Sequence, residues 1–130
     1  MPINLIAVGV AAVVAYALAA LWYSPVLFFK AWQAELGLTD EQAKRASRPT
    51  TLAAAFLIVL AGTVAFAFFL GKVTPAQGAL YGLTAGFVWV AGSIGINYLF
   101  EGKSLRFFLI NGGYHTLEFT LIGLILGLIH

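Results

Sequence analysis

The stretch that decides the fold is residues 51–70, TLAAAFLIVLAGTVAFAFFL, in which no side chain is charged. At a helical rise of about 1.5 Å per residue this stretch is about 30 Å long, which matches the hydrocarbon core of a bilayer. On either side, three more largely apolar runs of similar length cover residues 3–23, 76–100 and 105–129. Because lipid offers the backbone no hydrogen-bond partner, each run is expected to be a helix.

The composition indicates a lipid environment for the whole chain. Of its 130 residues, 62% are hydrophobic and only 9% are charged, whereas about 25% of the residues of a soluble domain are charged. A soluble domain of this length has too small an interior to cover so much apolar surface. We therefore predict an all-α fold, a four-transmembrane-helix bundle that forms a single membrane domain over residues 1–130.

Several function classes find no support in the residues present. The chain has no cysteine, so it can form neither a disulfide nor a thiolate nucleophile nor a sulfur metal site. No Ser-His-Asp set, pair of carboxylates or phosphate-binding glycine loop is visible, and we expect neither an enzyme nor a bound cofactor. The net charge is only +2, and the basic residues lie beside the apolar runs, which argues against a nucleic-acid partner.

More than half of the charged side chains lie in one polar segment, residues 24–50, between the first two runs. Residues 26–36 predict a short amphipathic helix at the membrane interface, stopped by Gly37. Thr39 and Gln42 have the spacing of a capping box and predict a second short helix. We interpret the segment as a well-anchored loop, with a docking surface for a partner protein as the alternative.

The distribution of basic residues predicts the orientation. Six of the seven Lys and Arg residues lie in residues 24–50, in the turn at residues 101–104, or just after it at Arg106, and Lys72 is the seventh. By the positive-inside rule both of these loops are cytoplasmic and both termini face outward. The aromatic residues expected at the two membrane borders are Trp22, Tyr23, Trp32, Tyr98 and Phe100.

Glycines at four-residue spacing predict close helix packing, because small residues let helix backbones approach in lipid. Gly78, Gly82 and Gly86 follow this spacing in the third run, and Gly123 and Gly127 do so at the end of the fourth. Whether these faces meet within one bundle or between copies of the chain is left open by the pattern.

One charged residue lies near the middle of a span. Glu118 is close to the midpoint of residues 105–129, where a charge costs about 3 kcal/mol on insertion scales. Burial favours the neutral form of a carboxyl group. Glu118 is therefore a proton carrier, a buried hydrogen-bonding acid, or a charge that meets water in a cavity.

Glu118 belongs to a polar face that forms our candidate intramembrane site. Four side chains recur at helical offsets of 0, 3, 4 and 7 in the fourth run and so share one face: Asn111, Tyr114, His115 and Glu118. The third run offers a second polar stripe at offsets of four: Trp89, Ser93 and Asn97. Folding the hairpin near Gly102 predicts that the two stripes face each other.

Each of these residues also has a structural interpretation. The asparagines and Ser93 could form interhelical hydrogen bonds that fix the helix register. Tyr114 could be a packing aromatic and His115 a histidine with its hydrogen bonds satisfied. His115 and Glu118 together supply only two ligands, so we expect no metal site.

Four short motifs carry a resemblance to a known family. They are PIN at residues 2–4, WYSP at 22–25, NYLFE at 97–101 and INGGYH at 110–115. Over essentially the whole chain the sequence resembles the bacterial membrane family called domain of unknown function 1761. The resemblance implies a short four-helix protein of the bacterial inner membrane without an established activity. It therefore transfers no catalytic residue, and Glu118 is not among the matching positions.

Two function hypotheses follow, and a membrane enzyme is a weaker third. The first is a small homo-oligomeric proton-coupled transporter or permease, with His115 and Glu118 as a proton relay and with Trp89 and Tyr114 lining the site. The alternative is an accessory or assembly subunit of a larger membrane complex, in which the small-residue faces and residues 24–50 are docking surfaces.

Overall fold

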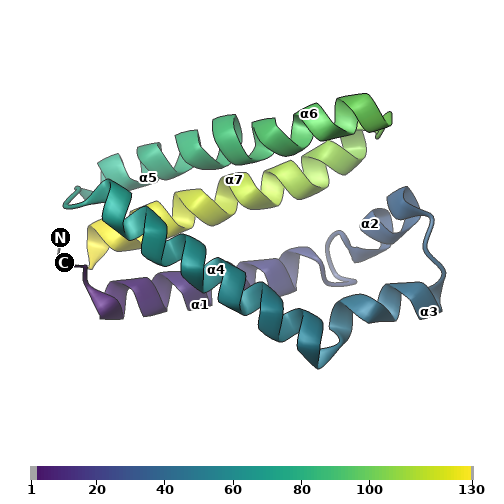
Figure 1. The fold of residues 1–130 in the computed structure, drawn as a ribbon, viewed down its shortest axis with the longest axis horizontal. Coiled ribbons are helices and arrows are strands. Elements are labelled where there is room, and N and C mark those ends of the chain that lie inside the picture. Colours follow the sequence, from purple (N-terminus) through teal and green to yellow (C-terminus); the bar gives the residue numbers. More distant parts are fainter. Residues whose placement is uncertain (1–2, 130) are drawn as a thin grey trace.

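The computed structural model describes residues 3–129, which form an all-α structure without strands. Long helices run beside one another, α4 crosses them obliquely, and two short helices lie beyond the end of α1 (Figure 1). In chain order the elements are α1 (Leu5–Trp22), α2 (Phe29–Leu36), α3 (Asp40–Ala43), the 3₁₀ turn η1 (Lys44–Ser47), α4 (Pro49–Leu70), α5 (Pro75–Thr84), the π-helical segment η2 (Ala85–Ala91), α6 (Gly92–Glu101) and α7 (Leu105–Leu128).

Three helices are long and apolar enough to cross a membrane: Leu5–Trp22, Pro49–Leu70 and the continuous rod α5–η2–α6 from Pro75 to Glu101. Within the described residues α7 is not in this class, although its 24 residues are enough to span a bilayer. Its polar residues, Glu118 among them, lower its mean hydropathy. The all-α prediction is confirmed, and among residues 3–129 three helices, rather than the four expected, are long and apolar enough to cross a membrane.

Local side chains set the helix ends. Thr39 and Gln42 form the predicted capping box at the start of α3, and Thr74 with Gln77 forms another at the start of α5. The hydroxyl of Ser104 accepts the backbone N–H of Phe107 and caps α7. Such caps satisfy backbone N–H groups that the helix itself leaves unpaired, and they therefore fix the residue at which each of these helices begins.

Helix α7 is the centre of the bundle, because it packs against α1, α4, α6, α2 and, most extensively, α5 with η2. A Cβ atom added at Gly78 would overlap the carbonyl oxygen of Gly123, and one added at Gly82 would overlap that of Phe119. The other glycines that lie against the backbone of the facing helix are Gly86 and Gly127. The glycine faces therefore meet within one chain, and they bring α5 and α7 to backbone contact.

The opposite side of α7 rests on alanines of α1. Ala11 and Ala15 are fully buried and form a core cluster with Ile122 of α7. Val59 and Phe66 of α4 cover this cluster. Because α1 and α5 enclose α7 from two sides, residues in the middle of α7 face protein in both directions.

The π-helical segment shifts the packing face of the rod by one residue. The small residues of the rod that face α7 keep a spacing of four up to η2, jump by five across it, and then return to four. They are Gly78, Gly82, Gly86, Ala91 and Gly95, of which all but Gly95 are buried. Ala91 lies against Gly112, and Gly95 lies against the ring of Phe108. The wider π turn takes up the additional residue and keeps one continuous face toward α7.

The segment between α1 and α4 folds onto the start of α7. Glu35 of α2 accepts a hydrogen bond from the hydroxyl of Ser104, and one of its oxygens lies 3.9 Å from a guanidinium nitrogen of Arg106. The ring of Phe28 packs on Trp22 with 4.7 Å between ring centroids. The predicted short helix is thus present, and it is held against the bundle by one carboxylate and an aromatic contact.

Candidate functional site

The polar centre of the molecule is the carboxyl group of Glu118, which is 6% exposed in the middle of α7. One oxygen, Oε1, lies 2.9 Å from Nδ1 of His115. The other, Oε2, lies 3.2 Å from the hydroxyl of Tyr114, which is also 3.2 Å from the carbonyl oxygen of Ala15 in α1. Because residues three and four apart lie on adjacent turns of one face, a single helix presents all three side chains together.

This arrangement can hold its protons in more than one way. The hydroxyl of Tyr114 has one proton and two oxygen neighbours, and the carbonyl of Ala15 can only accept. If Tyr114 donates to Ala15, its contact with Glu118 requires a proton on the carboxyl; if Tyr114 donates to Glu118, the carboxylate accepts. The contact between His115 and Glu118 has the same two forms. Because a carboxyl group carries at most one proton, the heavy-atom positions fit an ionised Glu118 and a Glu118 protonated at either oxygen.

His115 is the part of the cluster with access to the outside. Its side chain is 33% exposed, whereas that of Glu118 is 8% exposed. His115 is therefore the member of the cluster that reaches the surface of the bundle. Among residues 3–129, no three His, Asp or Glu side chains lie together as a metal site requires.

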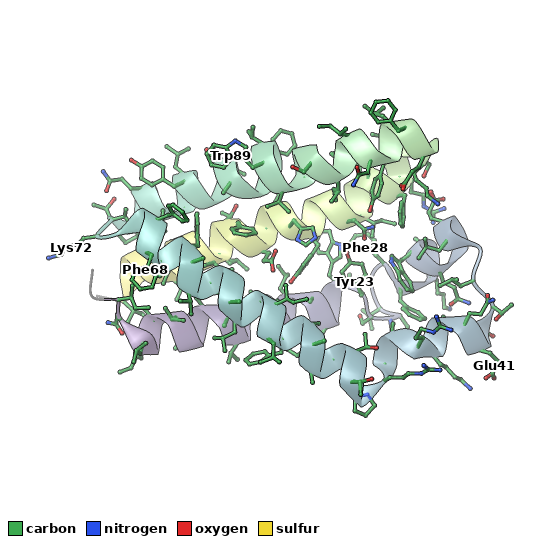
Figure 2. The ribbon with its side chains drawn as sticks, in the orientation of Figure 1. Tyr23, Phe28, Glu41, Phe68, Lys72 and Trp89 are labelled. Carbon is green, nitrogen blue, oxygen red and sulfur yellow. The ribbon has the colours of Figure 1, made fainter. Side chains whose placement is uncertain are left out.

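A second network lies about one turn away and is built around Asn111. Its Oδ1 accepts a hydrogen bond of 2.7 Å from the hydroxyl of Tyr23, the residue that follows α1. Its Nδ2 donates one of 2.7 Å to the hydroxyl of Tyr98 in α6. The ring of Tyr23 packs edge-on against Tyr114 at 5.7 Å between centroids, so the two networks touch through aromatic rings. Figure 2 labels Tyr23 where α1 gives way to the polar segment.

Trp22 adds a third link between α1 and α7. Its indole N–H donates a hydrogen bond of 2.8 Å to the carbonyl of Ile110. Its ring lies against Gly113, where an added Cβ atom would be 3.2 Å away. The end of α1 is therefore fixed to α7 by two neighbouring aromatic residues.

The WYSP, NYLFE and INGGYH motifs thus meet in space, because each supplies a residue to these contacts. A family model described as a protein of unknown function, DUF1761, matches residues 6–127. The chain belongs to the DUF1761 family. This confirms the resemblance drawn from the motifs. No curated protein matches the chain, and no solved structure does.

In this DUF1761 protein the structure brings together only part of the predicted site. Tyr114, His115 and Glu118 form one cluster, with Asn111 a turn away. The expectation that the polar stripe of the third span faces them is wrong. All of its members are exposed on the outer side of the rod: Trp89, Ser93 and Asn97.

The physical reason is the π-helical segment. An α-helix that continued at a spacing of four would carry the packing face from Gly86 to position 90 and on to 94, beside Ser93. Instead that face passes through Ala91 and Gly95, which turns the polar stripe away from α7. Figure 2 shows Trp89 on the outer rod, and it is 66% exposed.

Three further participants were predicted only as interfacial aromatics: Trp22, Tyr23 and Tyr98. Each instead uses its polar atom to bond α7 or its asparagine. The signal that could have found them is chemical, because a buried Tyr or Trp needs a partner for its hydroxyl or N–H. The DUF1761 motifs contain the donors Trp22 and Tyr23, and they also contain Asn111, which accepts the hydrogen bond from Tyr23.

Proposed function

We propose that this DUF1761 protein spans the membrane four times, with α7 as the fourth span. The support is the position of α7, which is enclosed by α1 on one side and by α5 with η2 on the other. Tyr114 and Glu118 are buried against protein, so α7 need not be as apolar as a helix that faces lipid. The low mean hydropathy of α7 is then explained by its central position, where protein rather than lipid surrounds its polar side chains.

On this basis we propose that the protein carries protons as part of a small membrane transporter or permease. The observation that carries the proposal is Glu118, a buried acid whose two oxygens are held by two other proton-exchanging groups. An ionisable residue inside a span is costly and marks a proton or ion pathway by default. In this scheme His115 exchanges protons with the outside, Glu118 stores one, and Tyr114 sets the orientation of the carboxyl group.

The test is proton flux into liposomes that contain the purified protein and a pH-sensitive dye. Glu118→Gln keeps the size and hydrogen-bonding capacity of the side chain but cannot release a proton. We expect its flux to fall to the level of empty liposomes, while its helix content and melting temperature stay close to those of the parent. Glu101→Gln, an exposed position at the end of α6, is the matched control and should keep full flux. Normal flux with Glu118→Gln would refute the relay.

We further propose that the protein lies in the bacterial cytoplasmic membrane, with the polar segment and the α6–α7 turn in the cytoplasm. The support is the charge distribution. Lys72 lies in the α4–α5 turn, at the end of the bundle away from α2 and α3 (Figure 2), and the other Lys and Arg residues belong to the polar segment and to the region around the α6–α7 turn.

An accessory subunit of a larger complex is the second candidate, and one observation favours it. Trp89, Ser93 and Asn97 are all exposed on the outer side of the rod, which fits a helix that meets another protein. Native mass spectrometry of the protein in lipid particles cut from its own membranes tests this role. Larger subunits at fixed stoichiometry would support it, and a homo-oligomer would support the transporter.

A further inference from the structure

The hydroxyl of Tyr114 lies between two helices. It is 3.2 Å from Oε2 of Glu118 on its own helix and also 3.2 Å from the carbonyl oxygen of Ala15 on α1. Both neighbours can accept a hydrogen bond, and the hydroxyl has a single proton to donate. Which of the two oxygens receives that proton therefore depends on the charge of Glu118.

A protonated Glu118 leaves the tyrosine proton for α1. With its proton on Oε2, the carboxyl group donates to the tyrosine oxygen, and Tyr114 in turn donates to Ala15. With the proton on Oε1 instead, both neighbours of the hydroxyl are neutral acceptors, and no charge draws the tyrosine proton away from Ala15. In both forms a hydrogen bond can join α7 to α1.

An ionised Glu118 takes the tyrosine proton for itself. A hydrogen bond to a charged oxygen is about twice as strong as one between neutral groups, so Tyr114 then donates to the carboxylate. The oxygens of Tyr114 and Ala15 are left facing each other without a hydrogen between them. The hydrogen bond between the two helices is lost at the moment when the acid becomes charged.

The contact that depends on this hydrogen bond is otherwise made of small side chains. In the middle of α1 an alanine face packs against Ile122 of α7. Within the described residues, the other hydrogen bonds that tie α1 to α7 come from Trp22 at its last turn and from Tyr23, which follows it. The C-terminal end of α1 is thus fixed independently of Glu118, whereas its middle is held by alanine contacts and by Tyr114.

We propose that Tyr114 couples the protonation of Glu118 to the contact between α1 and α7. In the protonated state the middle of α1 is bonded to α7, and the carboxyl group is closed off from water. When Glu118 loses its proton, the middle of α1 separates from α7 and water reaches the carboxylate. The separation stabilises the ionised acid, because a charge without water inside a span is costly. This inference deepens the proposed proton relay, and it rests on the exchange of a proton by Glu118.

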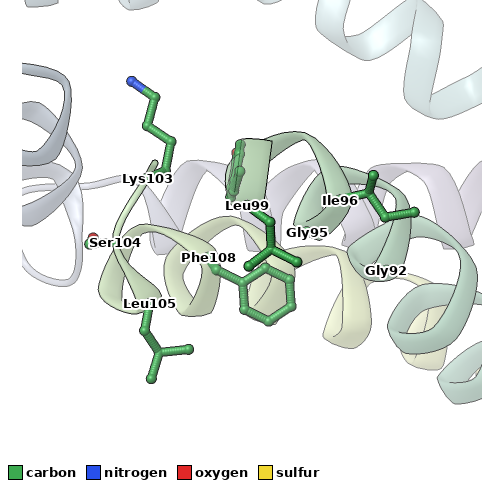
Figure 3. Close-up of a pocket in the computed structure, with 9 residues that line it drawn as sticks. Gly92, Gly95, Ile96, Leu99, Lys103, Ser104, Leu105 and Phe108 are labelled. Atoms are coloured by element: carbon green, nitrogen blue, oxygen red, sulfur yellow. The ribbon is translucent and has the colours of Figure 1, made fainter. Parts of the chain in front are cut away.

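The groove between α6 and the start of α7 gives water no other route to Glu118 (Figure 3). Its volume is about 410 Å³, and Leu99 and Phe108 are among the apolar side chains that line it. None of its lining residues belongs to α1 or to the part of α7 beyond Phe108. A movement of α1 is therefore the change that we expect to bring water to the carboxyl group.

The groups packed around the cluster include few that titrate. The helices α1, α4 and α5 and the segment η2 contain no charged residue. The titratable neighbours of the cluster are His115 on α7, which contacts Oε1 of Glu118, and Tyr23, whose ring packs on Tyr114. The elements α2 and α6 meet the first part of α7, before Glu118, and their charged residues are Lys30, Glu35 and Glu101. The experiment must therefore separate Glu118 from His115.

The test measures the distance between α1 and α7 by pulsed electron paramagnetic resonance in lipid particles. The chain has no cysteine, so spin labels can be placed on Val13→Cys and Leu117→Cys, whose parent residues are 58% and 42% exposed. The pH is raised from about 4 to about 9, a range that covers both exposed and buried carboxyl groups. We expect the distance to increase by about 2 Å, a typical size for a helix shift at an interface.

Variants of the labelled protein identify the groups responsible. Tyr114→Phe is expected to abolish the pH response, whereas the matched control Tyr16→Phe should keep it, because the hydroxyl of Tyr16 bonds the carbonyl of Leu52 in α4. Glu118→Gln is expected to stay at the short distance at every pH, since its amide donates to Tyr114 as the protonated acid does. A pH response that persists in Glu118→Gln would assign the titration to another group, such as His115, and would overturn the proposal.

Proton flux into liposomes separates this inference from the proposed function. A parent protein that carries no protons but shows a pH response dependent on Tyr114 would keep the coupling and refute the transporter. Flux in a parent protein whose distance does not change with pH would keep the transporter and overturn the coupling, as would a response that survives in Tyr114→Phe. Helix content and melting temperature show that Tyr114→Phe, which lacks a single oxygen atom, is folded.

Discussion

At the scale of single residues, Asn111 is the side chain that joins three helices. It belongs to α7, accepts a hydrogen bond from Tyr23 at the C-terminal end of α1, and donates one to Tyr98 of α6. Lipid offers no replacement partner for either of these hydrogen bonds. A buried polar group left without a partner costs about 1–3 kcal/mol.

Asn111→Leu is therefore expected to lower the free energy of unfolding by about 2 kcal/mol, because it leaves two tyrosine hydroxyls unpaired. The measurement is thermal or denaturant unfolding in detergent micelles. Thr84→Val is the control, since Thr84 is exposed and its hydroxyl bonds only its own helix. A similar loss of stability in both variants would mean that Asn111 does not join the helices.

At the scale of elements, the glycine face between α5 and α7 is the contact on which the bundle depends. Gly82→Leu places a side chain where the carbonyl of Phe119 already lies. The helices must separate, and we expect a loss of about 3 kcal/mol or more. Gly62→Leu is the matched control, because an added Cβ atom at Gly62 in α4 meets nothing within 4 Å. Protease resistance in membranes measures the difference, and equal resistance of the two variants would contradict the role of the glycine face.

The sequence predicts the elements well and their facing surfaces less well. Each apolar run is close to a helix in length, and Thr39 and Ser104 cap helices as their positions predict. The cluster of Tyr114 and Glu118 follows from helical spacing alone, since all of it lies on one helix. The outward orientation of Ser93 could not be predicted from the sequence, because no residue type signals a π turn. The one additional residue in that turn rotates the later part of the helix relative to α7. The hydrogen bonds between helices depend on packing that no local pattern encodes.

At the scale of the whole molecule, the basic residues mark one end of the bundle. Lys72 lies at the opposite end, close to where α1 begins and α7 ends (Figure 1). By the positive-inside rule, we expect this asymmetry to set the proposed direction of insertion.

Single-cysteine variants test that direction. Lys72→Cys is expected to react with a membrane-impermeant thiol reagent on intact cells, and Lys103→Cys only after the membrane is opened. Both positions are exposed, so accessibility within the protein does not limit either reaction. Labelling of Lys103→Cys on intact cells, with Lys72→Cys protected, would reverse the orientation.

The central position of α7 also has a consequence for how the protein is made. Translation delivers α1, α4 and the α5–η2–α6 rod to the membrane before α7 leaves the ribosome, since α7 follows them in the chain. Until then the surfaces of α5 and α1 that pack against α7 in the finished bundle are without that partner. Helix α7, which is less apolar than the three candidate spans, is thus made last, when the helices that pack against it have already been made. With α7 as the fourth span, as we propose, its insertion and the closure of the bundle are expected to be a single event.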